Sequence, residues 1–231
     1  MGKYDAYKQM VYECIMDLVR EGFVHGLGGN VSMRVDGEDV VAVTPSQREY
    51  SDLTAGEICV VDFDLKPVDD AGLKPSIETG MHIAVYRNRK DVGAVVHTHQ
   101  IYASIFSLIH QPIPPLFDEV VSTIGPVVEV VPYGLSGSKR LQENVAARLG
   151  NRANCYILQN HGVLALGADP QKAKRCAELL EACARIYYYA LSTGKEISLL
   201  PKEAQELMGR IVIDTQDDEN KRREHIKLKK D

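Results

Sequence analysis

The distribution of apolar residues along the chain predicts a domain of mixed α/β class. Through residues 1–200, segments with apolar residues at helical spacing alternate with short runs rich in β-branched residues. No repeat, low-complexity tract or Pro/Ser-rich linker divides this range, so we expect a single domain there. Hydrophobic residues form 45% and charged residues 26% of the 231 residues, which is typical of folded domains and excludes a disordered or coiled-coil chain.

The N-terminal part is expected to form a helix followed by three strands. Residues 4–21 place apolar side chains on one face at helical spacing. Residues 30–43 alternate apolar and polar side chains around Asp36-Gly37, a pattern typical of a tight hairpin. A third strand is expected near residues 58–62.

The rest of the domain is expected to continue with interspersed helices and strands. Helical spacing returns in residues 76–89, where Ser76 follows a proline and is expected to cap the free backbone amides. A β-branched strand at 93–99 and a helix at 101–109 follow. The remaining expected elements are a strand at 127–131, a helix at 138–149, strands at 155–159 and 163–166, and a helix at 169–192.

Residues 201–231 differ in composition from the rest of the chain. They are highly charged, include the run Lys221, Arg222 and Arg223, and have little apolar surface to bury. We expect a charged tail appended to the 1–200 domain, in the form of a solvated, partly frayed helix.

The charge balance and the cysteines limit the classes of partner and compartment. Lys and Arg number 27 against 32 Asp and Glu, a net charge of −5 that argues against nucleic-acid binding. Neither a signal-peptide pattern nor the ~18 consecutive apolar residues of a membrane span occurs, so we expect no membrane partner. Five cysteines at unpaired spacings in apolar stretches indicate buried thiols of a reducing compartment, and we expect a cytoplasmic protein.

Three histidines stand in contexts typical of a metal site. His97 and His99 end an apolar strand as His-Thr-His, and residues two apart on a strand share one face. His161, in Gln-Asn-His-Gly, could add a third imidazole from another strand end. Three nitrogen ligands leave coordination positions open, as in catalytic metal sites. The alternative is that all three are ordinary polar residues at loop edges.

A carboxylate and several short polar residues could complete such a site. Glu78 lies in the first turn of an expected helix, where the helix dipole favours negative charge. Beside a bound cation it would be a general-base candidate; alone it would be a simple first-turn acid. A Gly-rich loop and two turns offer amides and hydroxyls of the kind that cradle an anion. The candidate anion-binding residues are Gly29, Asn30, Thr44, Ser46 and Ser76.

The order of these short motifs identifies a family resemblance. The motifs are Gly-Gly-Asn-Val-Ser (28–32), Thr-Pro-Ser (44–46), Lys-Pro-Ser-Ile-Glu (74–78), Val-Val-His-Thr-His (95–99), Pro-Tyr (132–133) and Asn-His-Gly (160–162). Their succession closely resembles the class II aldolase/adducin family over roughly residues 5–195. Each motif alone is common, but the combined pattern is highly specific.

The resemblance implies a fold, an assembly and a set of site residues. It implies a three-layer α/β/α sandwich with a central, mostly antiparallel sheet, and a homotetramer with active sites between subunits. It places His97, His99 and His161 on the family's metal ligands and Glu78 on its acid/base carboxylate. Tyr133 matches a tyrosine that donates a proton in a neighbouring subunit's site. The positions of Asn30, Ser46 and Ser76 match those that hold a phosphate or an equivalent anion.

The chain departs from the family pattern at its anion site and its tail. Ile77 stands where the family usually has a second serine, and Gln47 stands where it usually has glycine. We therefore consider a substrate that ends in a carboxylate or smaller polar group, with Gln47 or Arg48 as its partner; alternatively, Arg48 is only a surface charge. No tyrosine follows Tyr189 to match the family's C-terminal tyrosine. The carboxylates of Asp118 and Glu119 are expected in a loop, and a role as a second acid is the alternative.

The function that follows from the resemblance is metal-dependent carbon–carbon cleavage of a small hydroxy-carbonyl or sugar-phosphate-like substrate through a metal-stabilised enediolate. Three imidazoles suit zinc and also accept manganese, cobalt or iron. The first alternative is a metal-dependent decarboxylase of a sugar acid or related carboxylate, and the next is a 4-epimerase. The alternative from another class is a non-catalytic, adducin-like interaction module.

Overall fold

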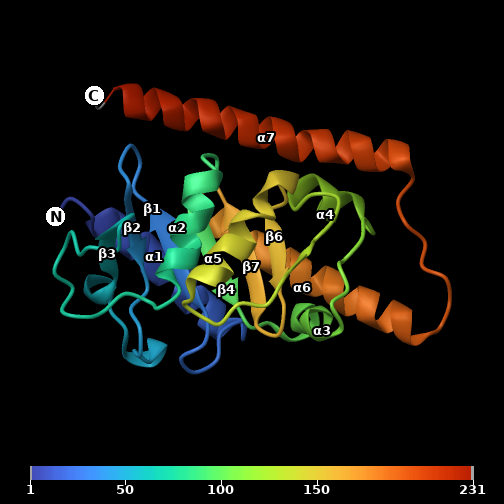
Figure 1. The fold of residues 1–231 in the computed structure, drawn as a ribbon, viewed down its shortest axis with the longest axis horizontal. Helices are drawn as coiled ribbons and strands as arrows, with labels where there is room; N and C mark the ends of the chain where they lie inside the picture. Colours follow the sequence, from blue (N-terminus) through green and yellow to red (C-terminus); the bar gives the residue numbers. More distant parts are fainter. Residues whose placement is uncertain (1, 230–231) are drawn as a thin grey trace.

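The computed structural model describes residues 2–229 and contains a seven-stranded sheet with helices on both of its faces (Figure 1). The strands are β1 (Asn30–Arg34), β2 (Val40–Val43), β3 (Cys59–Asp62), β4 (Ala94–Thr98), β5 (Val130–Val131), β6 (Cys155–Leu158) and β7 (Gly162–Gly167). Their order across the sheet is β3-β2-β1-β4-β7-β6-β5, and every pair is antiparallel except the parallel pair β5–β6. The mostly antiparallel sheet predicted from the family resemblance is confirmed.

Helices cover both faces of the sheet because its strands are apolar on both sides. Val96 of β4 belongs to the core under α1 (Asp5–Arg20), α3 (Ile101–Ile109) and α6 (Pro170–Ser192). The adjacent Val95 belongs to the second core, on the side of α2 (Thr79–Asn88) and α5 (Lys139–Ala146). Alternation along a strand sends neighbouring side chains to opposite faces, so both faces are buried. The predicted three-layer α/β/α architecture is confirmed.

The start of α2 and two other elements differ from the sequence expectation. The helix begins at Thr79 rather than near residue 76, because the chain first makes a turn in which the Glu78 N–H donates to Ser76 Oγ at 3.2 Å. The expectation that Ser76 caps the helix is therefore wrong. The expected strand at 127–131 is reduced to β5, and the loop expected around Asp118 is a short helix, α4 (Asp118–Thr123).

The pairing of three central strands brings distant motifs to one end of the sheet. His97 of β4 lies opposite Asn30 at the start of β1 on one side and opposite Leu164 of β7 on the other. The turn that carries His161 directly precedes β7. The Gly-rich loop and the two histidine motifs therefore converge where β1 and β7 begin and β4 ends.

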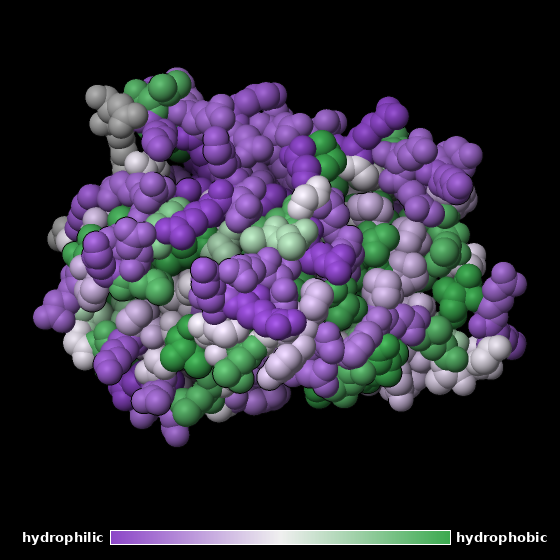
Figure 2. Space-filling view, viewed as in Figure 1, coloured by the Kyte–Doolittle hydropathy of each residue, from purple (hydrophilic) through white to green (hydrophobic). Residues whose placement is uncertain are grey.

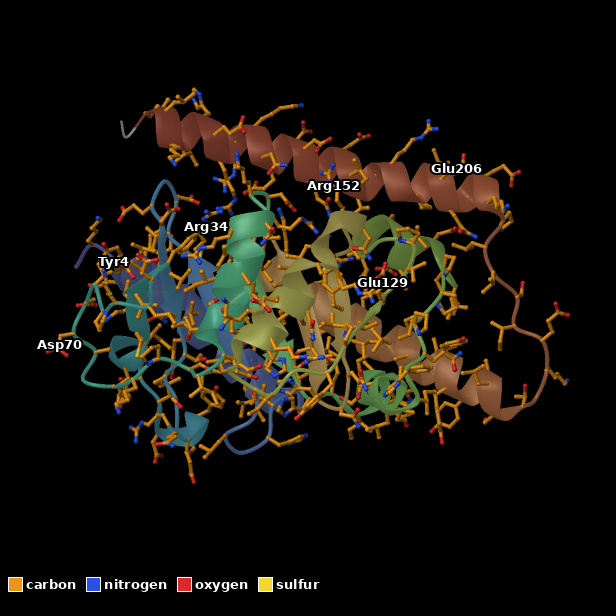
Figure 3. All side chains as sticks on the ribbon, viewed as in Figure 1. Tyr4, Arg34, Asp70, Glu129, Arg152 and Glu206 are labelled. Atoms are coloured by element: carbon orange, nitrogen blue, oxygen red, sulfur yellow. The ribbon has the colours of Figure 1, made fainter. Side chains whose placement is uncertain are left out.

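The C-terminal residues form one long helix, α7 (Lys202–Leu228), on the opposite side of the molecule from α3 (Figure 1). It packs on α4, and its buried Gln216 accepts a hydrogen bond from Arg152 Nε at 2.9 Å. Arg152, labelled in Figure 3, also pairs with Asp217 at 2.6 Å. The exposed surface along α7 is mostly hydrophilic (Figure 2). The expected tail is thus a continuous helix that docks through a face with the buried Val212 and Gln216. The helix α3, which begins two residues after His99, lies on the other side of the molecule (Figure 1).

Arg223 is expected to be the principal charged anchor of α7. Its side chain is 10% exposed, pairs with Asp36 at 2.9 Å and donates to the Ala168 carbonyl at 2.8 Å. Arg223→Ala should therefore lower the free energy of unfolding by about 2 kcal/mol, roughly 4–8 °C in Tm, measured by thermal denaturation. The adjacent Arg222 is 48% exposed, and Arg222→Ala should cost less than about 0.5 kcal/mol. Equal losses for the two variants would contradict this role of Arg223.

Candidate active site

Four polar side chains from three separate segments meet at this end of the sheet. His97 lies in β4 and His99 just beyond it, His161 lies in the turn between β6 and β7, and Glu78 immediately precedes α2. His97 is fully buried, and Glu78 is 6% exposed. The structure therefore brings together the three histidines and the carboxylate that the sequence singled out.

The imidazole nitrogens converge on one another and on the carboxylate. The three histidines offer ligand atoms that all lie within 4.8 Å of one another, and His99 Nε2 lies 3.0 Å from His97 Nε2. Glu78 Oε2 is 3.3 Å from His97 Nε2, and Glu78 Oε1 is 3.1 Å from His161 Nε2. So dense a group of electron-pair donors is suited to a cation.

The tautomer of His97 fits metal binding. Its Nδ1 lies 2.8 Å from the Val163 carbonyl oxygen, which can only accept, so Nδ1 carries the proton. In the neutral ring Nε2 then presents a bare lone pair to the group, and such a second hydrogen bond is the usual way in which metal-binding imidazoles are oriented. Gly162 allows the start of β7 to lie close to the end of β4, because a Cβ at this position would lie 2.7 Å from His99 Cδ2 and 2.4 Å from the Thr98 carbonyl oxygen. These residues could hold a divalent metal ion.

The surroundings of these buried groups keep His97 and His99 neutral and Glu78 ionised. Desolvation lowers the pKa of His97 to about 4 and also lowers the pKa of His99. Burial alone would raise the pKa of Glu78, but the neighbouring imidazoles and the Ser136 hydroxyl together lower it below its usual range. At neutral pH, His97 and His99 therefore offer lone pairs and Glu78 offers a negative charge, the protonation states that a metal site requires.

Two further side chains fix the orientation of Glu78. Asn30 Nδ2 donates to Oε2 at 2.8 Å, and Ser136 Oγ donates to Oε1 at 2.5 Å. From the sequence, Asn30 is predicted to bind an anionic group of the substrate. In this structure its side-chain amide nitrogen contacts the Glu78 carboxylate. Sequence reasoning missed Ser136; the only signal was its place three residues after Tyr133 in a Gly/Ser-rich loop.

The candidate anion-binding turns lie beside this group and are hydrogen-bonded to each other. The Ser46 N–H donates to the Lys74 carbonyl at 2.8 Å, and the Ser76 N–H donates to the Thr44 carbonyl at 3.0 Å. The Thr44 side chain is fully buried, and its hydroxyl accepts from the Val31 N–H. Among the candidates on these two turns, Ser46 and Ser76 are partly exposed, and the Ser76 hydroxyl accepts from the Glu78 N–H.

The residues that depart from the family pattern occupy contrasting positions. Ile77 is 68% exposed at the rim of the site. Gln47 adopts the left-handed backbone region at φ 56°, a conformation that glycine adopts without strain. Arg48 forms an ion pair with Glu57 at 3.1 Å and donates to the Asp52 carbonyl, so its guanidinium is engaged away from the site.

The remaining candidates do not join the four polar side chains. Tyr133 is 50% exposed, and within residues 2–229 its hydroxyl has no hydrogen-bond partner. Its backbone is fixed by Gln159 Oε1, which accepts from the Tyr133 N–H at 3.0 Å. Asp118 and Glu119 lie on α4, where Glu119 pairs with Arg175 at 3.2 Å. A helix that packs on α6 and α7 carries these acids away from the histidines.

A second polar group joins α2 to β1 behind the site. Ser32, two residues after Asn30 on the same face of β1, lies 2.8 Å from His82 Nδ1 and 2.7 Å from the Tyr86 hydroxyl. His82 follows Glu78 by one helical turn and is fully buried. These contacts fix the position of α2, and hence of Glu78, relative to the strand that carries Asn30.

Comparison with known proteins places the chain beside enzymes that cleave sugar phosphates. The family model described as the class II aldolase and adducin N-terminal domain matches residues 9–188. An L-fuculose phosphate aldolase from Escherichia coli O6:H1 is 32% identical over 196 residues, 85% of this chain and 88% of that protein. A 5-deoxy-D-ribulose 1-phosphate aldolase from Bacillus thuringiensis serovar kurstaki is 32% identical over 82% of this chain and 87% of that protein.

Solved structures show the same similarity. An L-fuculose 1-phosphate aldolase has a TM-score of 0.84 at 31% identity, covering 91% of this chain and 97% of the other. YgbL from Klebsiella pneumoniae, described as an aldolase, epimerase or decarboxylase, has a TM-score of 0.80 at 27% identity, covering 90% of this chain and 100% of the other.

The three-histidine group should bind about one divalent metal ion per chain. Removing one imidazole leaves two nitrogen ligands, so His161→Ala and His97→Ala should each lose most of the metal, measured by elemental analysis of untagged protein. His225→Ala, on the exposed surface of α7, serves as the control and should keep it. An unchanged metal content in His161→Ala would remove that residue from the ligand set.

Metal-free protein should lose stability as the pH falls from about 6.5 towards 4. Burial lowers the pKa of His82 to about 3, whereas in the unfolded chain this group binds a proton near pH 6.5. The unfolded state therefore takes up more protons in this window, and stability falls by up to about 1.4 kcal/mol per pH unit for this group. His82→Gln should flatten the dependence of Tm on pH, whereas His225→Gln should leave it unchanged.

Proposed function

The chain belongs to the class II aldolase and adducin family and is a lyase of the class II aldolase type, and from this premise we propose that it cleaves a phosphorylated ketose by a metal-dependent retro-aldol reaction. The relatives with about a third of their residues identical act on L-fuculose phosphate and on 5-deoxy-D-ribulose 1-phosphate. The family resemblance inferred from the motifs is thereby confirmed. Cleavage between C3 and C4 of a ketose 1-phosphate would give a three-carbon keto phosphate and an aldehyde.

The observation that carries this proposal is the placement of Glu78 against the three imidazoles. The ionised carboxylate of Glu78 lies 3.1 Å from His161 Nε2 and 3.3 Å from His97 Nε2. It can therefore exchange a proton with a substrate that binds beside these nitrogens. A divalent cation bound there would supply Lewis-acid stabilisation of the negative charge that develops on substrate oxygen. A non-catalytic module has no need of this buried acid–base arrangement.

We assign the proton transfers to two residues of this chain. In the direction of cleavage, Glu78 returns a proton to the carbon of the keto fragment after the C3–C4 bond breaks; in the reverse direction it removes that proton. Tyr133, with its exposed hydroxyl, would exchange a proton with the oxygen of the aldehyde fragment in a neighbouring subunit's site. Ser46 and Ser76 would hold the phosphate with Gly29 and Asn30, and Thr44 would support their turns from within the sheet.

A decarboxylase is the second candidate, and Ile77 favours it. The side chain at this rim position is apolar and 68% exposed, so it cannot donate to a phosphate oxygen as the expected serine would. For YgbL, at 27% identity, decarboxylase is one of the three alternative assignments given. The engaged guanidinium of Arg48 gives no support to that residue as the partner of a substrate carboxylate.

We further propose zinc as the metal, because three neutral imidazoles suit it, with manganese, cobalt or iron as alternatives. A homotetramer with sites between subunits would use the apolar side chains exposed on α3 and α6. These side chains are Ile101, Leu108, Ile109, Ile186, Tyr188 and Tyr189. Such exposed groups are typical of subunit contacts.

The domain division and the compartment are proposals of the same kind. Residues 1–200 would form the catalytic domain and 201–231 an appended segment, of which residues 230 and 231 lie outside the described part; the family match ends at residue 188. None of the helices in residues 2–229 is long and apolar enough to cross a membrane. All five cysteines are free and buried, which supports a reducing, cytoplasmic location.

The decisive assay incubates metal-loaded protein with L-fuculose 1-phosphate, 5-deoxy-D-ribulose 1-phosphate and a panel of keto sugar acids. Release of an aldehyde supports the retro-aldol reaction, and release of carbon dioxide from the acids alone would overturn it in favour of decarboxylation. Glu78→Gln should keep the metal but lower kcat at least about 100-fold. Glu119→Gln, on α4, is the matched control and should retain normal rates; a Glu78→Gln variant with normal rates would exclude Glu78.

A further inference from the structure

Ser136 makes the shortest hydrogen bond to the candidate general base, and it is not part of any motif that identified the family. Its Oγ lies 2.5 Å from Glu78 Oε1, on the side of the carboxylate that also faces His161. Hydrogen bonds to an ionised acceptor are short and about twice as strong as neutral ones. The residue therefore contacts the carboxylate without belonging to the metal-binding group.

The loop that carries Ser136 is anchored on both sides, so the hydroxyl is held in place. A Cβ on Gly137 would lie 3.1 Å from the Ile77 carbonyl, which shows how closely this loop packs on the turn before Glu78. Ser138 caps α5 by accepting from the Leu141 N–H at 3.2 Å. Upstream, Asn144 Nδ2 donates to the carbonyls of Pro132 and Tyr133.

Metal binding changes which groups can support Glu78. His97 Nε2 carries no proton in the tautomer described above, and a His161 Nε2 that coordinated a cation would carry none either, so neither ring could donate to the carboxylate in the metal-loaded enzyme. The hydrogen-bond donors that remain are Asn30 Nδ2 on Oε2 and Ser136 Oγ on Oε1. One donor therefore remains on each oxygen, and together the two restrict the rotation of the carboxylate about its Cγ–Cδ bond.

We propose that Ser136 is a positioning residue that holds the Glu78 carboxylate in its proton-transfer orientation in the metal-loaded enzyme, an inference that rests on the function proposed above. Because the same loop carries Tyr133, this bond also ties the loop of the proposed proton donor to the turn of the proposed base. Without the hydroxyl, Oε1 keeps no donor of its own once the histidines are occupied.

The test compares three zinc-loaded variants with the wild type in kinetics, metal content and crystal structure. Ser136→Ala should keep the metal and the KM within about twofold, and should lower kcat about ten- to hundredfold. Ser136→Thr, which restores a hydroxyl, should recover most of kcat. Ser138→Ala, two residues away on the same loop, removes a helix cap and should lower Tm by a few degrees with kcat unchanged.

Several outcomes would overturn the proposal. They are a normal kcat in Ser136→Ala, a raised KM with normal kcat, loss of metal together with activity, or the absence of rescue by threonine. The crystal structures decide independently of turnover: the Glu78 carboxylate should contact the hydroxyl of residue 136 in the wild type and rotate away in Ser136→Ala. If the wild type cleaves none of the substrates, the proposed function fails, and an unmoved carboxylate in the variant would separately refute the role of Ser136.

Discussion

The close contact between a buried carboxylate and three imidazoles is the constraint on which the site depends. An acid that is 6% exposed is costly to ionise unless polar partners surround it, and the partners of Glu78 are the donors Asn30 and Ser136 and the imidazoles of two histidines. Each partner comes from a different segment of the chain. The antiparallel pairing of β1, β4 and β7 is what brings those segments together, so the fold and the electrostatics of the site cannot be separated.

The same arrangement explains why α2 is held so firmly to the sheet. Ser32 and Asn30 share one face of β1 and contact residues one turn apart on the helix, His82 and Glu78. The buried, neutral His82 is tolerated there because its Nδ1 forms a hydrogen bond with the Ser32 hydroxyl. Displacing the helix along the strand would break both contacts at once, which makes the position of the carboxylate a property of the whole strand–helix pair.

Much of the fold, and the group of three histidines and one carboxylate, could be predicted from the sequence. Helical spacing and β-branched runs are local signals, and two histidines two residues apart at a strand end fix their common face. The roles of Thr44 and Ser136 could not be predicted in this way, because one hydroxyl is taken by a neighbouring strand and the other is brought to Glu78 by loop packing. Likewise the docked face of α7 depends on contacts with distant segments, such as that of Gln216 with Arg152, and α4 depends on its packing against α7.

The five buried thiols can report the local unfolding of this protein. Burial raises the pKa of Cys14 to about 12 and the pKa values of Cys59 and Cys183 to about 11, so these three residues present almost no thiolate to an alkylating reagent in the folded protein. Cys59 lies in β3, Cys155 in β6 and Cys176 in α6, so the thiols sample separate parts of the sheet and its cover. The rate at which each thiol becomes reactive would therefore map, without any engineered label, the sequence in which the layers separate.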